Sequence, residues 1–185
     1  FGATEAEAAA LLLRARDLGL RPYGITFHVG SQCTSPDAWR RALAATGRVM
    51  AAVAAEGVTL PMLNIGGGFP ARYGGSPASG VPDIEEIGAA VRPALADLLP
   101  YRPAVLAAEP GRHLVAESGV LVATVLGREV RAGENWIYLD VGAYNGLMET
   151  LQTATGWQFP LWTSRADHAS VPQVPYTVTP PGGPR

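Results

Sequence analysis

Lysine is missing from this sequence: all 14 basic residues among the 185 are arginine. Cysteine is almost missing as well, since Cys33 is the single one. One cysteine excludes a disulfide framework and a zinc site built from cysteines, and it fits a protein of the reducing cytosol. We therefore expect a cytoplasmic protein without structural disulfides and without a metal site.

Strong charge of one sign and long apolar runs are also lacking. The net charge is −2, and no basic cluster marks a surface for nucleic acid or for a membrane. No apolar run approaches the roughly 18 residues of a membrane span. The first ten residues hold two glutamates and no basic residue, unlike a signal peptide, and no methionine begins the chain. We expect a globular piece that starts inside a longer protein.

Hydrophobic patterning alternates between helices and strands over the first two thirds of the chain. Helices are predicted over residues 4–18, 35–56 and 82–99, and short apolar strands over residues 24–29, 62–65 and 104–108. Such alternation is typical of a parallel sheet, and the spacing fits a (β/α) barrel. Because a complete barrel takes about 250 residues, we predict an α/β fold that contains part of a (β/α)8 barrel.

The pattern changes after Arg112. Residues 115–130 and 136–141 are predicted to be strands with no helix between them. This change indicates a second, β-rich domain. We therefore expect two domains, the later part of a barrel over residues 1–114 and the truncated start of a β-rich domain over residues 115–185.

Each predicted barrel strand ends in a polar or glycine-rich motif. The motifs are Phe27-His-Val-Gly-Ser-Gln32, Asn64-Ile-Gly-Gly-Gly-Phe-Pro70 and Ala108-Glu-Pro-Gly-Arg112. In a (β/α) barrel the carboxyl ends of the strands carry the active site. The three motifs are therefore predicted to converge at one mouth.

Three groups in these motifs suit a phosphate. Gly66, Gly67 and Gly68 offer consecutive backbone N–H groups with no side chain in the way. Arg112 adds a fork-shaped cation, and Ser31 adds a hydroxyl donor. Each feature has a plainer alternative: a flexible turn for the glycines, a surface salt bridge for Arg112 and a helix cap for Ser31.

Three further side chains carry reactive groups. His28 lies at a strand end, where it is either structural or catalytic. Glu109 follows an apolar strand, where a carboxylate is costly unless it is paired. Its partner is either Arg112 or a cationic ring nitrogen of a ligand. Cys33 has no assignable base and is interpreted as an inert thiol.

Taken together, the motifs resemble those of the decarboxylases with an alanine-racemase-like barrel (fold type III), which use pyridoxal phosphate. That family acts on ornithine, lysine, arginine or diaminopimelate. The matching stretches are F-H-V-G-S, N-I-G-G-G-F-P, E-P-G-R and the segment from Tyr138 to Leu147. The resemblance runs from Phe1 to about Thr179, and it implies pyridoxal phosphate as the cofactor and amino-acid decarboxylation as the activity.

The resemblance also implies a role for each matching residue. His28 would stack on one face of the cofactor ring, and Glu109 would pair with the pyridine nitrogen and keep it protonated. A protonated ring is the better electron sink, so these two are the expected catalytic residues. The phosphate would be held by Ser31, Gly66, Gly67, Gly68, Gly111 and Arg112.

Some of the family pattern is not in this chain. The Schiff-base lysine of the family lies upstream of Phe1, and a Cys-x-x-Asp-like segment, shared across a homodimer, lies beyond Arg185. We therefore expect the 185-residue chain to be inactive by itself and its parent to be a homodimer with a shared active site. The second motif begins with Asn64 where the family usually has aspartate, which is expected to alter local hydrogen bonding without abolishing activity.

Residues 140–150 bear on the substrate. In diaminopimelate decarboxylases the corresponding stretch carries an arginine that grips the distal carboxylate, whereas the aligned residue here is Glu149. An acid attracts an amine, so we expect decarboxylation of a basic amino acid, ornithine before lysine, and hence a place in putrescine and polyamine synthesis. The alternatives are a surface role for Glu149, a diaminopimelate or lysine decarboxylase, a racemase, and a non-catalytic regulatory relative.

Overall fold

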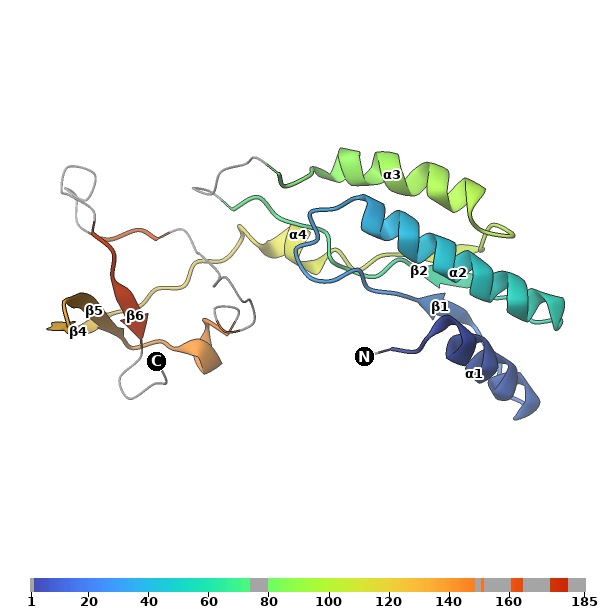
Figure 1. The fold of residues 1–185 in the computed structure, drawn as a ribbon, viewed down its shortest axis with the longest axis horizontal. Coiled ribbons are helices and arrows are strands. Elements are labelled where there is room, and N and C mark those ends of the chain that lie inside the picture. The colour runs from blue at the N-terminus through green and yellow to red at the C-terminus, as the bar shows by residue number, and fades with distance from the viewer. Residues whose placement is uncertain (1, 74–79, 149–150, 152–160, 165–173, 180–185) are drawn as a thin grey trace. The chain divides into compact units, whose positions relative to one another are not determined.

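Figure 1 shows the fold of the chain in a computed structural model, which describes residues 2–73, 80–148, 151, 161–164 and 174–179. The chain divides into two compact units; the main division falls between Ser118 and Gly119, and Tyr73 also belongs to the second unit. Each unit has a three-stranded sheet of its own. The domain boundary expected from the sequence, between residues 114 and 115, lies inside the first unit.

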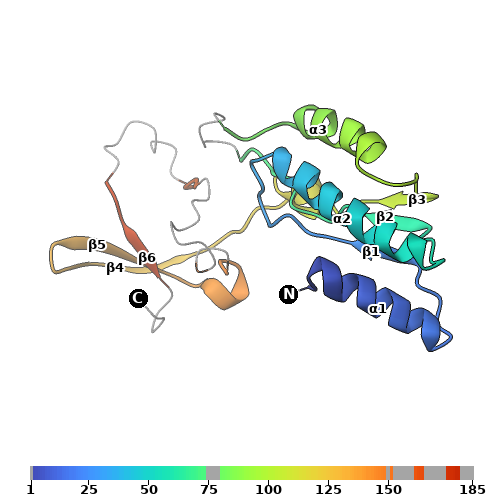
Figure 2. The ribbon, with the colours of Figure 1, turned by 45° about the vertical axis from the view of Figure 1, so that its right-hand side comes forward.

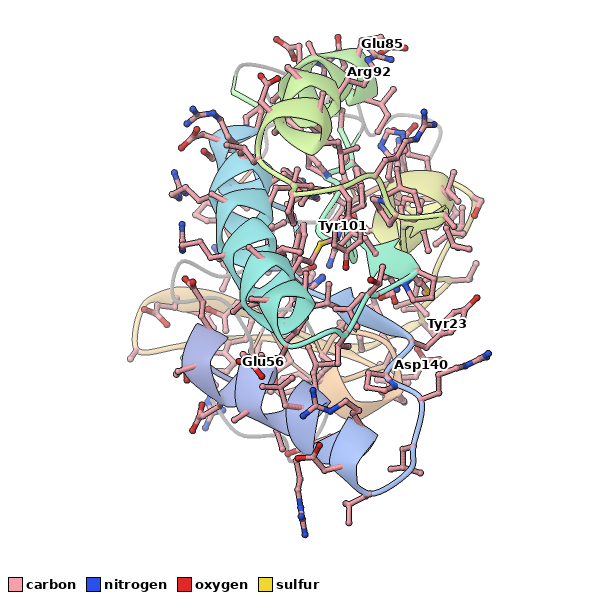
Figure 3. All side chains as sticks on the ribbon, turned by 90° about the vertical axis from the view of Figure 1, so that its right-hand side faces the viewer. Tyr23, Glu56, Glu85, Arg92, Tyr101 and Asp140 are labelled. Atoms are coloured by element: carbon pink, nitrogen blue, oxygen red, sulfur yellow. The ribbon has the colours of Figure 1, made fainter. Side chains whose placement is uncertain are left out.

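The first unit alternates helices with parallel strands, as the sequence predicts. Its elements are α1 (Glu5–Asp17), β1 (Gly24–Thr26), α2 (Asp37–Ala55), β2 (Met62–Asn64), α3 (Ile84–Asp97), β3 (Val105–Ala107) and α4 (Gly111–Val115). The strands pair in the order β1-β2-β3, with Ile25 opposite Leu63 and Leu63 opposite Leu106. Figures 2 and 3 show α1, α2 and α3 on one side of this sheet. Consecutive units of a (β/α) barrel have this arrangement.

Local sequence explains where two of these helices begin. Thr4 and Asp83 accept hydrogen bonds from the N–H groups of Glu7 and Glu86, and each glutamate reaches back to the N–H of its cap. Gly19, with a φ of +75°, follows the end of α1. Among the described helices, none combines the length and the apolar composition that a membrane span requires.

The core of the first unit lies between the helices and the sheet. Trp39 of α2 and Leu63 of β2 are fully buried, and the rings of Trp39 and Phe69 lie 5.1 Å apart. The same cluster contains the α3 residues Ile87, Val91 and Ala94. In a second cluster, the N–H of Leu60 donates to the hydroxyl of Tyr101 at 2.8 Å (Tyr101 is labelled in Figure 3). These contacts fix the helices against the strands whose ends carry the motifs.

The second unit is built on a hairpin. β4 (Val125–Arg131) and β5 (Glu134–Leu139) are antiparallel, and the two-residue turn Ala132-Gly133 joins them. β6 (Thr177–Thr179) pairs with β5 in parallel. The strand order β4-β5-β6 places the strand that follows the hairpin beside β5.

Few side chains of the second unit are buried. Thr124 and Asp140 close the open end of the hairpin, since the N–H of Asp140 donates to the Thr124 carbonyl at 3.1 Å and the N–H of Thr124 donates to Asp140 Oδ1 at 2.8 Å (Asp140 is labelled in Figure 3). A short 3-10 helix, η1 (Ala143–Asn145), follows. Of the described side chains in this unit, only those of Val141 and Thr179 are buried. The described hairpin therefore has little core of its own.

The structure corrects the sequence prediction at the junction of the units. Gly111–Val115 is helical, and the strand predicted over residues 115–130 begins only at Val125. Valine and leucine between these elements favour a strand by composition. A strand also needs a neighbour to bond with, and no described residue pairs with this segment in a sheet. Its apolar side chains are exposed: Val120, Leu121 and Val122.

Candidate cofactor site

The carboxyl ends of β1, β2 and β3 lie side by side. Thr26, Asn64 and Ala107 occupy equivalent positions on the three strands. Backbone hydrogen bonds continue past these ends, since the N–H of Ile65 donates to the Ala107 carbonyl at 2.9 Å and the N–H of Glu109 donates to the Gly66 carbonyl at 2.8 Å. The three motifs are therefore joined at one edge of the sheet, as the sequence predicts.

Tight packing against the other two motifs explains the three glycines. A Cβ at Gly66, where φ is +65°, would lie 1.9 Å from the carbonyl oxygen of Phe27. A Cβ at Gly67 would lie 2.8 Å from the carbonyl oxygen of Glu109 and 3.1 Å from Cε1 of His28. Real Cβ atoms essentially never approach another atom within 3.0 Å, so a side chain at either position would force the backbone to shift. The glycine loop is thus a packed crossing of three chain segments, and the flexible turn that the sequence left open does not describe it.

Two N–H groups of the glycine loop are already engaged within the chain. The N–H of Gly66 donates to Oδ1 of Asn64 at 2.9 Å, and the N–H of Gly67 donates to Nδ1 of His28 at 3.1 Å. The N–H of Gly68 has no hydrogen-bond partner in the part of the chain that the structure describes. Of the three backbone donors expected for a phosphate, Gly68 alone is therefore free among the described residues.

His28 has a defined role toward the loop. Its ring nitrogen Nδ1 accepts the hydrogen bond from Gly67, so this nitrogen carries no proton and a proton on the neutral ring sits on Nε2. The side chain is otherwise exposed at the edge of the sheet. This bond fixes the plane of the imidazole and leaves its exposed surface available to a ligand.

Glu109 is held by both its backbone and its side chain. Its Oε1 accepts a hydrogen bond from Nδ2 of Asn64 at 2.6 Å, and its N–H is bonded to Gly66. Oε2 accepts no hydrogen bond from any residue that the structure describes. The side chain is exposed, so one carboxylate oxygen is fixed while the other can accept a hydrogen bond from a ligand.

Arg112 and Ser31 meet although they are far apart in the sequence. Nη2 and Nε of Arg112, at the start of α4, donate to Oγ of Ser31 at 3.0 and 3.3 Å. A Cβ at the neighbouring Gly111 would have no atom of the described residues within 4 Å. A guanidinium, a hydroxyl and an open backbone position thus lie together, which is a donor set suited to a phosphate.

Two residues that organise this site, Gln32 and Asn64, had no role predicted from the sequence. Gln32, with a φ of +52°, donates through Nε2 to the carbonyl of Ala71 at 2.8 Å and accepts from the N–H of Ala71 through Oε1 at 3.0 Å. It clamps the first motif to the end of the second. Asn64 bridges Gly66 and Glu109. The sequence did show that Asn64 stands where the family usually has aspartate, but it did not indicate which residues Asn64 bonds to.

Two other candidates complete the predicted set. The thiol of Cys33 donates to the carbonyl of Ser35 at 3.5 Å, and the N–H of Cys33 donates to the carbonyl of Gly68 at 2.8 Å. Both contacts are structural, which agrees with the interpretation of an inert thiol. Glu149, the candidate for substrate selection, lies outside the described residues.

Comparison with known proteins gives one consistent family. A family model described as "Pyridoxal-dependent decarboxylase, pyridoxal binding domain" matches residues 1–116. The lysine/ornithine decarboxylase of Selenomonas ruminantium is 35% identical over 165 residues, which are 87% of this chain and 39% of that protein. Antizyme inhibitor 2 of Xenopus laevis is 35% identical over 130 residues, which are 70% of this chain and 27% of that protein.

A solved structure matches both units. The crystal structure of lysine/ornithine decarboxylase from Vibrio vulnificus, complexed with putrescine, is similar with a TM-score of 0.75 and 35% sequence identity. The similarity covers 97% of this chain and 47% of that one. The chain therefore spans less than half the length of these relatives.

Proposed function

Since the chain belongs to the pyridoxal-dependent decarboxylases, of which it carries part of the pyridoxal-binding domain, we propose that its parent protein decarboxylates a basic amino acid, with ornithine as the first candidate. Relatives named as decarboxylases of lysine and ornithine support the substrate class. One observation about the site carries the proposal. Three strand ends bring the Arg112–Ser31 pair and the Glu109 carboxylate to one glycine loop.

The residues at this edge fit pyridoxal phosphate. Arg112, Ser31 and the N–H of Gly68 are donors for the phosphate, and the open position at Gly111 leaves room for it. His28 offers the exposed face of an imidazole to an aromatic ring. Oε2 of Glu109 accepts no hydrogen bond from the described residues and is the acceptor for the pyridine N–H. The donor set thus matches both ends of the cofactor.

Glu109 has the central chemical task in this proposal. Loss of carbon dioxide leaves an electron pair on the α-carbon of the substrate, and bound pyridoxal phosphate supplies the electron sink. Glu109 would hold a proton at the pyridine nitrogen, because a carboxylate beside that nitrogen stabilises its positive charge. His28 would offer the ring a fixed surface to stack on, since Gly67 fixes the imidazole.

Gly111→Ala in the full-length parent tests the phosphate assignment. The new methyl group meets no atom of the described residues within 4 Å, so the described structure accommodates it and a bound ligand would be the group it strikes. We expect pyridoxal phosphate to bind about tenfold more weakly or worse, the scale of forcing a methyl group into a packed site. Fluorescence titration measures this affinity.

Gly119→Ala is the matched control, because a Cβ there also meets nothing within 4 Å and the residue belongs to the second unit. Equal affinities of the two variants for pyridoxal phosphate would refute the phosphate assignment. Gly67 is a poorer choice for this test, since a side chain there strikes the backbone of Glu109 and the ring of His28 whether or not a cofactor binds.

The choice of ornithine depends on Glu149. An acid near the distal end of the substrate attracts an amine and repels a carboxylate. We expect the full-length parent to release carbon dioxide from ornithine with a higher kcat/KM than from lysine, arginine or meso-diaminopimelate, and Glu149→Gln to reduce the preference for ornithine. A kcat/KM highest for diaminopimelate would contradict this interpretation of Glu149.

Two parts of the proposed active site come from outside these 185 residues: the lysine that binds the cofactor, and a segment contributed by the second subunit of a homodimer. The chain itself contains no lysine. We expect the chain alone, mixed with pyridoxal phosphate, to lack the visible absorbance band of a lysine-bound cofactor. Light scattering of the full-length parent checks the dimer.

A non-catalytic regulator is the second candidate. The match to antizyme inhibitor 2, whose name describes no enzyme, favours it. The two candidates differ in one measurement on the full-length parent, which is the release of carbon dioxide from the four amino acids in the presence of pyridoxal phosphate. Turnover supports the decarboxylase, and absence of turnover from all four supports the regulator.

A further inference from the structure

Asn64 joins the glycine loop to Glu109. It is the last residue of the central strand β2, and its neighbour Leu63 is buried in the core with the helices. Because side chains alternate along a strand, Asn64 lies on the opposite face of the sheet. There its Nδ2 donates to Oε1 of Glu109 at 2.6 Å, and its Oδ1 accepts from the N–H of Gly66 at 2.9 Å.

These two hydrogen bonds fix the orientation of the amide. The N–H of Gly66 can only donate and an ionised Glu109 can only accept, so a flipped Asn64 amide would satisfy neither. A hydrogen bond from a neutral donor to a carboxylate stabilises the ionised form. With asparagine at this position, the donor is present at every pH. An aspartate in its place, the residue usual in the family that these motifs resemble, donates only while it carries a proton.

We propose that Asn64 is a positioning residue, which aims the carboxylate of Glu109 through a hydrogen-bond donor that is present at every pH. This inference rests on the proposed function and deepens it, since an ionised Glu109 is what holds the proton on the pyridine nitrogen.

The surroundings of Glu109 make the substitution Asn64→Asp a clean test. Other charged or titratable side chains described at this edge are His28, which follows β1, Cys33, whose N–H is bonded to Gly68, and Arg112 and His113 of α4. Nδ1 of His113 lies 3.0 Å from the carbonyl oxygen of Pro70. Nδ1 of His28 is bonded to Gly67, and Arg112 donates to Ser31. None of these contacts uses Oε1 of Glu109. Asn64→Asp keeps the size of the side chain and the acceptor for Gly66, and it changes the single donor to Oε1.

The experiment compares full-length wild type, Asn64→Asp, Asn64→Leu and Glu109→Gln from mildly acidic to mildly alkaline pH. It measures kcat, the affinity for pyridoxal phosphate by fluorescence, and the ¹⁵N chemical shift of the pyridine nitrogen in the bound cofactor, which reports protonation of the ring. We expect Asn64→Leu to lower kcat at every pH by about ten- to a hundredfold, the range for losing one hydrogen bond to a charged group.

Asn64→Asp should depend on pH in a way that the wild type does not. At the acidic end one proton is shared between the two carboxyl groups and restores a donor to Glu109, so kcat and the ¹⁵N shift approach those of wild type. As pH rises and this proton leaves, the like charges repel each other, kcat falls by about tenfold or more, and the ¹⁵N shift departs from the wild-type value. A purely structural Asn64 predicts no such pH dependence, because aspartate still accepts from Gly66.

The variants separate a failure of this inference from a failure of the proposed function. If Asn64→Asp matches wild type at all pH values while Glu109→Gln is impaired, the inference is wrong and the proposed function stands. If Glu109→Gln leaves kcat and the ¹⁵N shift unchanged, or if wild type binds no pyridoxal phosphate, the proposed function fails and the inference fails with it. A new pH dependence in Asn64→Asp, together with an impaired Glu109→Gln, supports both.

Discussion

The two units of this chain differ in how much of their structure is supported from within. In the first unit, α2, α3 and the central strand enclose a core in which Trp39, Leu43 and Leu63 are fully buried. In the second unit, the hairpin of β4 and β5 displays Val125, Leu126 and Val130 on its surface. Both units have apolar residues, but among the described residues only the first unit shows opposing layers that bury them.

This difference follows from how each unit is built. A βα unit brings its own cover, because the helix that follows each strand packs back onto the sheet. A hairpin extended by one short strand, as β6 extends β4 and β5, still needs a covered face, so it is marginal until other segments pack on it. The first unit therefore holds its strand ends in fixed register, and the candidate cofactor site lies at these ends.

Replacing a core residue should reveal the largest difference in stability between the two units. Trp39→Ala is expected to lower the free energy of unfolding of the full-length parent by about 3–5 kcal/mol, the usual cost of deleting a buried aromatic side chain. Trp39→Phe should cost less, because the buried Nε1 of Trp39 has no hydrogen-bond partner in the described structure. Val130→Ala in β4 should change the value by no more than about 0.5 kcal/mol.

Urea denaturation of the three variants measures these values. A loss of about 2 kcal/mol or more for Val130→Ala would show that segments outside these residues cover β4 in the parent. The difference in burial between the two units would then be a property of this piece of the protein and not of the parent.

Removing a charge from each unit should show a difference in kcat as well. Glu109→Gln is expected to lower kcat of the full-length parent at least about a hundredfold, since one charge about 4 Å away is worth roughly 4 kcal/mol as an upper guide at an effective dielectric near 20. Glu134→Gln, at the start of β5, is the matched control and should leave kcat unchanged. A rate for Glu109→Gln within about threefold of wild type would rule out ring protonation by Glu109.

Much of the first unit could be predicted from the sequence, because the signals there are local. Apolar runs of four to six residues marked the strands, and Thr4 and Asp83 marked helix starts that the structure places within one residue. Parallel strands end at one edge, so the meeting of the three motifs could be predicted as well. The second unit was harder, because whether residues 116–124 form a strand depends on a partner that composition does not reveal.

The hydrogen bonds within the site could not be predicted. The sequence left open whether Arg112 pairs with Glu109, and the structure gives it Ser31 as a partner. It also suggested three free glycine N–H groups, two of which are bonded to Asn64 and His28. Such contacts depend on the backbone path to within about an ångström, and neither spacing nor residue type specifies that path.

Removing a helix cap should have a smaller effect. Thr4→Ala is expected to lower the free energy of unfolding by about 1 kcal/mol at neutral pH. Hydrogen bonds from the backbone N–H and the hydroxyl of Thr4 hold the pKa of Glu7 below its ordinary value of 4.5. A lowered pKa in the folded state gives stability that is present above the unfolded-state pKa and is lost as pH falls below it.

The difference between wild type and Thr4→Ala should therefore shrink as pH falls below about 4.5, and thermal unfolding across that range checks it. Asp83→Ala, which removes the equivalent cap of α3, is the matched variant in the same unit. A difference between wild type and Thr4→Ala that stays constant down to acidic pH would show that Glu7 takes no part in the cap.

The smallest predicted effect stabilises the second unit. Ala132 and Gly133 form the turn between β4 and β5, with φ values of +50° and +84°. A two-residue hairpin turn with positive φ at both positions favours asparagine followed by glycine, whereas alanine is strained there. Ala132→Asn should therefore raise the free energy of unfolding by about 0.5 kcal/mol, and Ala132→Val should lower it by more, because a β-branched residue tolerates positive φ poorly. Hydrogen exchange of the amides of β4 and β5 in the full-length parent measures both changes locally. Equal exchange rates in wild type and both variants would mean that the rest of the parent, and not this turn, sets the stability of the hairpin.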